Sequence, residues 1–247
     1  MTKQRTRNLN ERPIIFSAPM VRAILDGRKT VTRRSVKWPG WANSEDAGQQ
    51  AALVRDKALA LYRDARPIKV LRCPYGGPGD RLWVRETWAH YQCVDHVRRP
   101  DGRSFSEVSD GLAGYKADGF DGIEDFRSHV KLMSGSACEA VEINGDRWRP
   151  SIHMPRWASR ITLEITGIRV ERLHEISFED AKAEGVERRV VCDGWREYGL
   201  PPDVEAAGTH PLQSARESYT SLWQSINGPG SWNANPWVWV VEFRRVP

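Results

Sequence analysis

The sequence predicts an α+β fold, in which a small set of strands is accompanied by a few helices. Three stretches, at 81–88, 161–170 and 236–246, combine alternation with β-branched and aromatic residues, which is typical of strands. Two others, at 18–26 and 214–227, place apolar residues at helical spacing. At 247 residues, 40% of them hydrophobic, the chain is long enough for one large domain or two small ones.

Helix signals delimit the N-terminal elements. Residues 1–12 predict a flexible basic arm, and the short apolar stretch 13–16 predicts a first strand. Ser17 can cap the helix at 18–26, and at Gly27 the chain can adopt a left-handed conformation and leave that helix. The segment after Gly27 is β-leaning, yet too polar for an ordinary core strand.

Positive charge is concentrated near the N-terminus. Residues 1–34 hold nine Lys or Arg against two acids, a balance of +7, so the other 213 residues sum to about −2 for a net charge of +5. Four of these cations lie within eight residues, at Arg28, Lys29, Arg33 and Arg34. Such a patch suits a phosphate-bearing or nucleic-acid-derived partner. For residues 1–12, a solvated tail is an equally open alternative.

The middle of the chain predicts inserted material. The Ala-rich stretch 45–66 is expected to be helical, within partly inserted sequence at about 38–72. Residues 89–147 are polar and Gly-rich with little periodicity, and they predict a long insertion that leaves the main fold. Residues 148–160, with two prolines and mixed polarity, predict an ordered loop that leads into the next strand.

The C-terminal part alternates helices and strands. After the strand at 161–170, Ser177 caps a short helix that ends at Gly185. The helix at 214–227 is expected to bury an apolar face made of Tyr219, Leu222, Trp223 and Ile226. We therefore expect a single domain over 13–247 with insertions at about 38–72, 89–147 and 187–212.

Several classes of protein are disfavoured. The chain has no apolar run of about 18 residues and no signal-peptide pattern, so we expect a cytoplasmic protein without a membrane partner. The four cysteines are scattered, which disfavours a disulfide framework. His90, Cys93 and His96 can be imagined around a metal, but their spacing fits no common zinc pattern. We predict no metal and no cofactor.

Three stretches carry a resemblance to a known family. The segment Gly27-Arg28-Lys29-Thr30-Val31-Thr32-Arg33-Arg34 resembles the G-x-K-x-x-T-x-R signature of the ASCH (activating signal cointegrator homology) domains, and the stretches 79–86 and 148–160 resemble larger phage and prophage members. The resemblance implies a small PUA-like β-barrel with flanking helices, enlarged by loop insertions. Some members of the family bind RNA, and one branch consists of amidohydrolases that act on 4-N-acetylcytidine.

Carried over by motif, the resemblance implies catalytic roles for Lys29, Thr32 and Glu184. A threonine hydroxyl needs an adjacent base to become a nucleophile, and a lysine can serve when burial or nearby cations lower its pKa. Glu184 precedes a helix-ending glycine, at the negative end of the helix dipole, which suits a proton donor. A surface Lys, a surface Thr and a solvated helix-end Glu are the open alternatives. Residues 29 and 32 point to opposite faces in a regular strand, so the hypothesis requires a bend between them.

Further side chains from the family-like stretches are candidates for substrate binding. In the strand at 81–88, Leu82 and Val84 share one face, while Trp83 and Arg85 share the other. Core packing of Trp83 is the alternative role for that residue. The substrate-binding candidates are Arg28, Arg33, Trp83, Arg85, Glu86 and Arg160.

The leading functional hypothesis is an amidohydrolase that removes an acyl group from the exocyclic amine of an N-acylated cytosine nucleoside. The alternative is an RNA-binding or other nucleic-acid-binding module, or a ribonuclease, that uses the same basic cleft. Eleven tryptophans can stack bases, but most lie in predicted strands or in the amphipathic helix, where core packing explains them. In both hypotheses the partner is a modified nucleoside or RNA.

Overall fold

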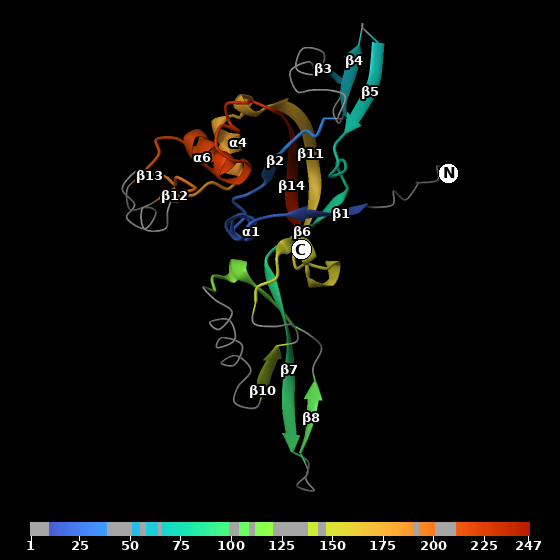
Figure 1. Ribbon diagram of the computed structural model, residues 1–247, viewed down its shortest axis with the longest axis vertical. Coiled ribbons are helices and arrows are strands. Elements are labelled where there is room, and N and C mark those ends of the chain that lie inside the picture. Colours follow the sequence, from blue (N-terminus) through green and yellow to red (C-terminus); the bar gives the residue numbers. More distant parts are fainter. Residues whose placement is uncertain are drawn as a thin grey trace, which may run out of the picture. The chain divides into compact units, whose positions relative to one another are not determined.

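The computed structural model is mixed α/β, with a mostly sheet core and few helices, which confirms the α+β class (Figure 1). The residues that the structure describes are 10–38, 51–54, 58–63, 66–98, 104–108, 112–120, 138–142, 147–189, 193–200 and 211–247.

The described elements follow one another along the chain with short 3-10 turns between them. The helices are α1 (Ala18–Leu25), α4 (Phe178–Ala183) and α6 (Ala215–Asn227). The 3-10 turns are η1 (Lys116–Asp118), η2 (Ser151–His153), η3 (Arg156–Ala158) and η4 (Leu173–Glu175). The strands are β1 (Glu11–Ile15), β2 (Val31–Ser35), β3 (Ala51–Val54), β4 (Ala58–Arg63), β5 (Arg66–Arg72), β6 (Arg81–Arg85), β7 (Trp88–Arg98), β8 (Ser104–Val108), β9 (Leu112–Tyr115), β10 (Cys138–Glu142), β11 (Thr162–Arg172), β12 (Arg188–Arg189), β13 (Gly194–Trp195) and β14 (Trp237–Val246).

The chain divides into two compact units. Unit 1 comprises Met1–Arg12, Ala23–Leu82 and Thr162–Pro247, and unit 2 comprises Pro13–Arg22 and Trp83–Ile161. The largest sheet has the strand order β1-β6-β11-β14-β2.

In unit 1, the antiparallel strands β11, β14 and β2 have two different faces. Directly paired residues share a face of a sheet, and one face is largely apolar, with Ile165 opposite Phe243 and Val170 opposite Trp239. The other face carries charge in rows across the three strands. Its central row is Arg169, Val240 and Arg33, and its flanking rows hold Gly167, Glu242 and Val31, and Glu171, Val238 and Ser35.

Helices α4 and α6 lie together beside these strands (Figure 1). Both begin at a serine whose hydroxyl accepts a backbone N–H, Ser177 from Asp180 at 3.0 Å and Ser214 from Glu217 at 3.2 Å. The Glu217 carboxylate accepts the Ser214 N–H in return, which completes a capping box. The predicted starts of both helices are therefore confirmed.

Unit 2 contains a small antiparallel sheet of its own, in which β7 is the central strand and pairs with β8, β9 and β10. Residues 148–160 form the expected ordered loop, built around η2 and η3. A cluster of buried side chains, Trp88, Met154 and Ala158, packs this loop against the start of β7.

Two sequence-based expectations are wrong for the described residues. The Ala-rich stretch expected to be helical forms β3 and β4, which pair with each other, and β4 also pairs with β5. Strand pairing here overrides the weak helix preference of alanine. The insertion expected at 89–147 stays a prediction, and its described part holds β7 to β10, strands that the sequence did not predict. Ile226, expected in the buried face of α6, is 52% exposed.

Other expectations agree closely or fall partly outside the described residues. The first strand spans Glu11–Ile15 rather than 13–16, and residues 1–9 of the expected arm lie outside the described part. In the expected insertion at 187–212, β12 pairs with β13, while residues 190–192 and 201–210 lie outside it.

Candidate functional site

The centre of the candidate site, in unit 1, is the buried side chain of Lys29. Its ammonium donates three hydrogen bonds, to the carbonyl of Val31 at 2.9 Å, to the carbonyl of Glu184 at 2.8 Å and to Glu184 Oε2 at 2.7 Å. Lys29 is 2% exposed and Glu184 is 3% exposed. An ammonium has three protons to donate, so these contacts use its full capacity.

Local backbone geometry brings the two residues together. Lys29 and Glu184 form an isolated antiparallel bridge, and the Thr30 N–H donates to the carbonyl of Ala183 at 2.9 Å. Gly185 ends α4 at a φ of +85°, and a Cβ at this position would lie 2.9 Å from Lys29 Cβ. Glycine is required there by both its conformation and the close approach of Lys29.

The carboxylate of Glu184 has partners beyond Lys29. Arg33 donates from its NH1 group to Glu184 Oε1 at 3.3 Å. The buried hydroxyl of Tyr219 on α6 also donates a hydrogen bond to this carboxylate. Burial raises the pKa of Tyr219 well above its ordinary value, and the negative charge of Glu184 raises it further. Tyr219 is therefore a neutral donor to Glu184.

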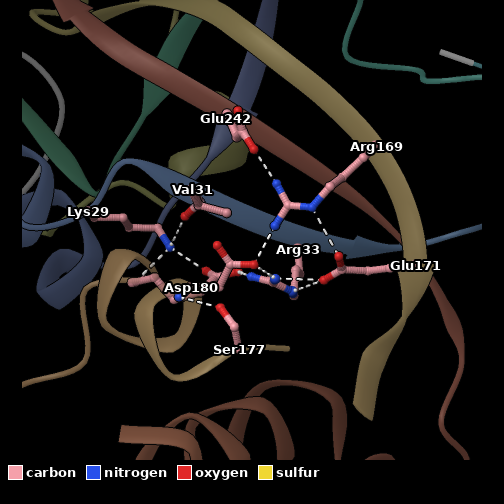
Figure 2. Close-up of polar contacts among 9 residues, drawn as sticks. Lys29, Val31, Arg33, Arg169, Glu171, Ser177, Asp180 and Glu242 are labelled. Atoms are coloured by element: carbon pink, nitrogen blue, oxygen red, sulfur yellow. Dashed lines mark hydrogen bonds and ion pairs between the residues drawn. The ribbon is translucent and has the colours of Figure 1, made fainter. Parts of the chain in front are cut away.

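Arg33 extends the network toward the charged face of the sheet (Figure 2). Its NH2 group lies 2.6 Å from Glu171 Oε1 and 2.6 Å from Asp180 Oδ2. Burial by itself lowers the pKa of Arg33, but Glu184 and Glu171 raise it above its ordinary value. The guanidinium is thus a permanent cation that three carboxylates surround.

A second arginine joins strands β11 and β14 to helix α4. Arg169 binds Glu171 at 3.0 Å and also forms ion pairs with Asp180 and Glu242 (Figure 2). Gly167 lies beside Glu242 in the adjacent row, where a Cβ would collide with the Glu242 carboxylate. We call this whole set the ionic cluster, and its members are Lys29, Arg33, Arg169, Glu171, Asp180, Glu184 and Glu242.

The electrostatics of Lys29 favour its neutral form more than those of an ordinary lysine. Burial lowers its pKa, and Glu184 opposes part of that shift. Arg34 and Arg33 lower the pKa further because they repel a second positive charge. A buried lysine with a lowered pKa beside a carboxylate can accept and return a proton.

Thr32, the third residue of the implied triad, is buried in β2. It pairs with Val241, and strand alternation places it on the apolar face, opposite to that of Arg33. Lys29 lies before the first residue of β2 and so is not part of this alternation. The contacts of the ionic cluster thus join Lys29 to Glu184, whereas Thr32 belongs to the other side of the strand.

Not all of the cations in the segment 27–34 lie on an exposed basic surface. Lys29 and Arg33 are buried among carboxylates. Arg28 is exposed, pairs with Asp26 at 2.9 Å and donates to the carbonyl of Gly185 at 3.2 Å. Arg28 therefore supports the backbone that follows Glu184.

Two of the substrate-binding candidates, Glu86 and Arg160, pair in unit 2. The buried Glu86 carboxylate accepts two hydrogen bonds from the Arg160 guanidinium, at 3.1 and 3.0 Å. Arg160 also pairs with Asp118 at 2.7 Å, and its guanidinium carbon lies 3.9 Å from the centroid of the Tyr115 ring. Burial raises the pKa of Glu86, and the hydrogen bond from Arg160 opposes that shift. These contacts fix the end of the 148–160 loop.

The last two candidates, Trp83 and Arg85, contact each other on β6. The Arg85 guanidinium carbon lies 5.0 Å from the centroid of Trp83, and Arg85 also donates to the carbonyl of Met154 at 3.0 Å. The buried residues of this strand are Leu82 and Val84, as the alternation predicts. Trp83 is half-buried, on the opposite face.

Sequence reasoning did not identify several members of the ionic cluster or the tyrosine bound to it. Arg169, Glu171 and Glu242 occupy one face of β11 and β14, whose other face is largely apolar, and such charges at alternating positions are the signal that could have revealed them. A tyrosine within the apolar face of α6 is a similar signal, because its buried hydroxyl needs a partner.

A separate cavity of 580 Å³ in unit 1 lies at the turn after β5. Its lining includes Arg12, Arg72, Asp80 and the buried free thiol of Cys73, and it does not include the ionic cluster. Within the described ranges, no group of three or more His, Cys, Asp or Glu is arranged to hold a metal ion. In that same part of the chain, no helix is long and apolar enough to cross a membrane.

Comparisons of this chain with protein-family models, with curated proteins and with solved structures find no match.

Proposed function

We propose that this protein is an amidohydrolase that removes an acyl group from the exocyclic amine of an N-acylated cytosine nucleoside. In this proposal the chain is a PUA-like barrel of the ASCH type, and Lys29 and Glu184 are its proton-transfer pair. The observation that carries it is the buried contact of 2.7 Å between Lys29 Nζ and Glu184 Oε2.

The energetic cost of this contact supports a functional role. Burying an ion pair costs several kcal/mol of desolvation for each ion, and the attraction between the charges often fails to recover that cost. Buried titratable pairs with shifted pKa values are enriched at functional sites. Lys29 is both buried and shifted in pKa, since its side chain is fully enclosed and that enclosure lowers its pKa.

The proposed reaction has two steps. The hydroxyl of Thr32 transfers its proton to neutral Lys29 and attacks the amide carbon, so that an Oγ–acyl bond forms as the amide C–N bond breaks. Glu184 relays the proton to the departing cytosine amine. Water then hydrolyses the acyl ester, which releases the carboxylic acid and restores the Thr32 hydroxyl.

The role of Thr32 as the nucleophile requires a particular backbone geometry between Lys29 and Thr32. Strand alternation places Thr32 on the apolar face. Its hydroxyl can therefore reach Lys29 only if the chain bends at the residues just before β2. A water molecule activated by Lys29 would give the same products without an acyl-enzyme. Thr32 and water are therefore distinguished by whether a covalent intermediate forms.

The test is to incubate the protein with 4-N-acetylcytidine and to measure cytidine release by mass spectrometry. Removal of a general acid or base typically costs about 10²- to 10⁴-fold in rate, so Lys29→Met and Glu184→Gln are expected to lose most turnover. Lys182 and Glu179 form an exposed ion pair on α4 at 3.1 Å, and Lys182→Met and Glu179→Gln are matched controls that retain turnover.

Three outcomes contradict parts of the proposal. Inactivity of the parent protein toward acetylcytidine and toward longer acyl derivatives overturns the activity. Full turnover by folded Lys29→Met overturns the assignment of the base. If Thr32→Val retains turnover and no acylated Thr32 peptide is found in the parent protein, water replaces Thr32 as the nucleophile.

A further inference from the structure

The loop of unit 2 that precedes β11 has an unusual composition. Residues 147–160 contain four arginines, one histidine and two tryptophans, with no Asp or Glu. This basic charge is separate from the N-terminal excess, and the hydrolysis proposed above does not use it.

Trp157 is the most exposed large hydrophobic side chain of this loop, at 60%. Two rings hold it in place through edge contacts. The centroid of buried Trp88 lies 5.6 Å away at an interplanar angle of 89°, and that of His90 lies 5.1 Å away at 62°. An aromatic side chain that is fixed before binding loses little conformational freedom when a partner stacks on it.

Arginines lie among the aromatic rings of the same unit. The guanidinium carbon of Arg149 is 5.4 Å from the centroid of Trp88, and that of Arg156 is 6.0 Å from the centroid of Trp83. Guanidinium groups over indole rings keep their positive charge, and their planar donor pattern is suited to phosphate oxygens.

The loop is also held firmly at its ends. Arg149 and Trp88 exchange two backbone hydrogen bonds, at 3.2 and 2.8 Å. Near the other end, Tyr115 donates to the carbonyl of Ala158 at 2.8 Å, and Ser159 donates to the carbonyl of Val84 at 2.8 Å. The aromatic and cationic groups are therefore displayed from a fixed backbone.

His90 contributes an uncharged aromatic ring to this arrangement. Burial lowers its pKa below the ordinary value, and Arg149 lowers it further. The imidazole is consequently neutral near pH 7, where it supports Trp157 without repelling the neighbouring guanidinium.

We propose that Trp157, His90, Arg149 and Arg156 form a stacking surface for single-stranded nucleic acid. A nucleobase stacks on the exposed Trp157 indole, and Arg149 and Arg156 contact phosphates on either side of it. Sequence-tolerant single-strand binding combines these two features, an aromatic platform and cationic groups along the backbone. The inference is independent of the amide hydrolysis, because it concerns other residues in the other unit.

The test measures fluorescence anisotropy of labelled oligouridylate and oligothymidylate of about 15 nucleotides, near the upper site size of small single-strand binders. The parent protein is expected to bind at least one of the two, with an affinity that falls as salt rises. Trp157→Ala is expected to weaken binding about 5- to 100-fold, the effect of losing one stacked base. Arg149→Gln and Arg156→Gln are each expected to weaken binding and to flatten its salt dependence.

Two controls separate stacking from general effects. Phe178 on α4 is a second exposed aromatic residue, at 48%, and Phe178→Ala is expected to bind like the parent. An abasic oligonucleotide keeps the phosphates but lacks the bases, so the parent and Trp157→Ala are expected to bind it equally.

Absence of binding by the parent protein overturns the proposal, as does unchanged affinity in folded Trp157→Ala. A parallel assay with vesicles of phosphatidylcholine and phosphatidylserine covers a competing partner. If Trp157→Ala loses only vesicle binding and keeps its affinity for oligonucleotides, the surface is a membrane contact and the proposal is wrong.

Discussion

Lys29 Nζ lies 2.7 Å from Glu184 Oε2, although the two residues are 155 positions apart in the chain. The contact joins the segment after α1 to the C-terminal end of α4. Both side chains are nearly inaccessible to water, so removal of one leaves its partner charged and buried. This relationship makes the pair important for stability as well as for the proposed chemistry.

We expect Lys29→Met to lower the free energy of unfolding by about 3 kcal/mol, because Glu184 stays buried without its shortest charged partner and keeps only Arg33, at 3.3 Å, as a cation beside it. Urea denaturation followed by circular dichroism measures the effect. The matched substitution Lys182→Met breaks an exposed pair with Glu179 and is expected to cost no more than about 1 kcal/mol. Equal losses in the two variants would show that the buried pair has no special role in stability.

The lowered pKa of Lys29 predicts how stability depends on pH. In the unfolded chain Lys29 binds its proton up to a pH near its ordinary pKa of 10.5, whereas in the folded protein it releases the proton at a lower pH. Between these two values the unfolded state binds more protons, so the contribution of Lys29 to stability rises with pH and is lost as pH falls.

The measurement compares the parent protein with Lys29→Met from neutral pH to pH 10.5. The free energy of unfolding of the parent is expected to rise relative to that of the variant over the upper part of this range. Using the difference removes the contribution of Tyr219, whose raised pKa acts in the opposite direction. A constant difference would mean that the pKa of Lys29 is the same in the folded and unfolded protein.

The elements that sequence patterns predicted well are those with local signals. Ser177 and Ser214 begin α4 and α6 as expected, and Gly185 ends α4 in the left-handed conformation. The alternation of β11 also agrees with its burial, whereas β14 buries four consecutive residues, Val238 to Val241. Caps and alternation depend on a few neighbouring residues, so they can be recognised without knowledge of the fold.

The elements that were mispredicted or missed depend on distant partners. The strands β3 and β4 form from an Ala-rich stretch because β5 pairs with β4, and β7 becomes a central strand because β8, β9 and β10 pair with it. Ile226 has helical spacing with Leu222 but lies in the last turn of α6, where it is exposed. Local propensity carries no information about such partners.

The same distinction applies to the candidate site. The motif pointed to Lys29 and Glu184 separately, but the row that aligns Arg33, Val240 and Arg169 follows from the register of three strands. One residue of slip would move Arg169 to the apolar face. The ionic cluster thus depends on the register of the sheet, which cannot be predicted from local sequence patterns.

We expect Gly185→Ala to destabilise the protein more than Gly27→Ala. Both glycines have positive φ angles, +85° and +73°, so both substitutions incur backbone strain of about 1 kcal/mol. At Gly185 the new methyl group would also lie 2.8 Å from Ala23 Cβ and 2.9 Å from Lys29 Cβ, whereas at Gly27 nothing lies within 4 Å. Thermal unfolding of the two variants gives the comparison, and an equal loss would mean that the chain relaxes around Gly185 without disturbing Lys29.

The thiol of Cys73 provides a test of burial in unit 1. Burial raises its pKa from the ordinary value of 9.0 to about 11, so thiolate is scarce at pH 8. Because the thiolate is the reactive form, we expect native Cys73 to be alkylated by iodoacetamide roughly 100-fold more slowly than an ordinary cysteine. Quantifying the peptide that contains Cys73 by mass spectrometry separates it from the other three cysteines, and the denatured protein is the control.

The pH profile of the same reaction distinguishes the raised pKa from simple inaccessibility. If the pKa limits the reaction, the native rate rises about tenfold for each pH unit toward 11, because the thiolate fraction rises by that factor. A slow rate that does not change with pH would instead mean that the reagent cannot enter. Since Cys73 lines the 580 Å³ cavity together with Arg12 and Arg72, we expect the first behaviour, with access through that cavity.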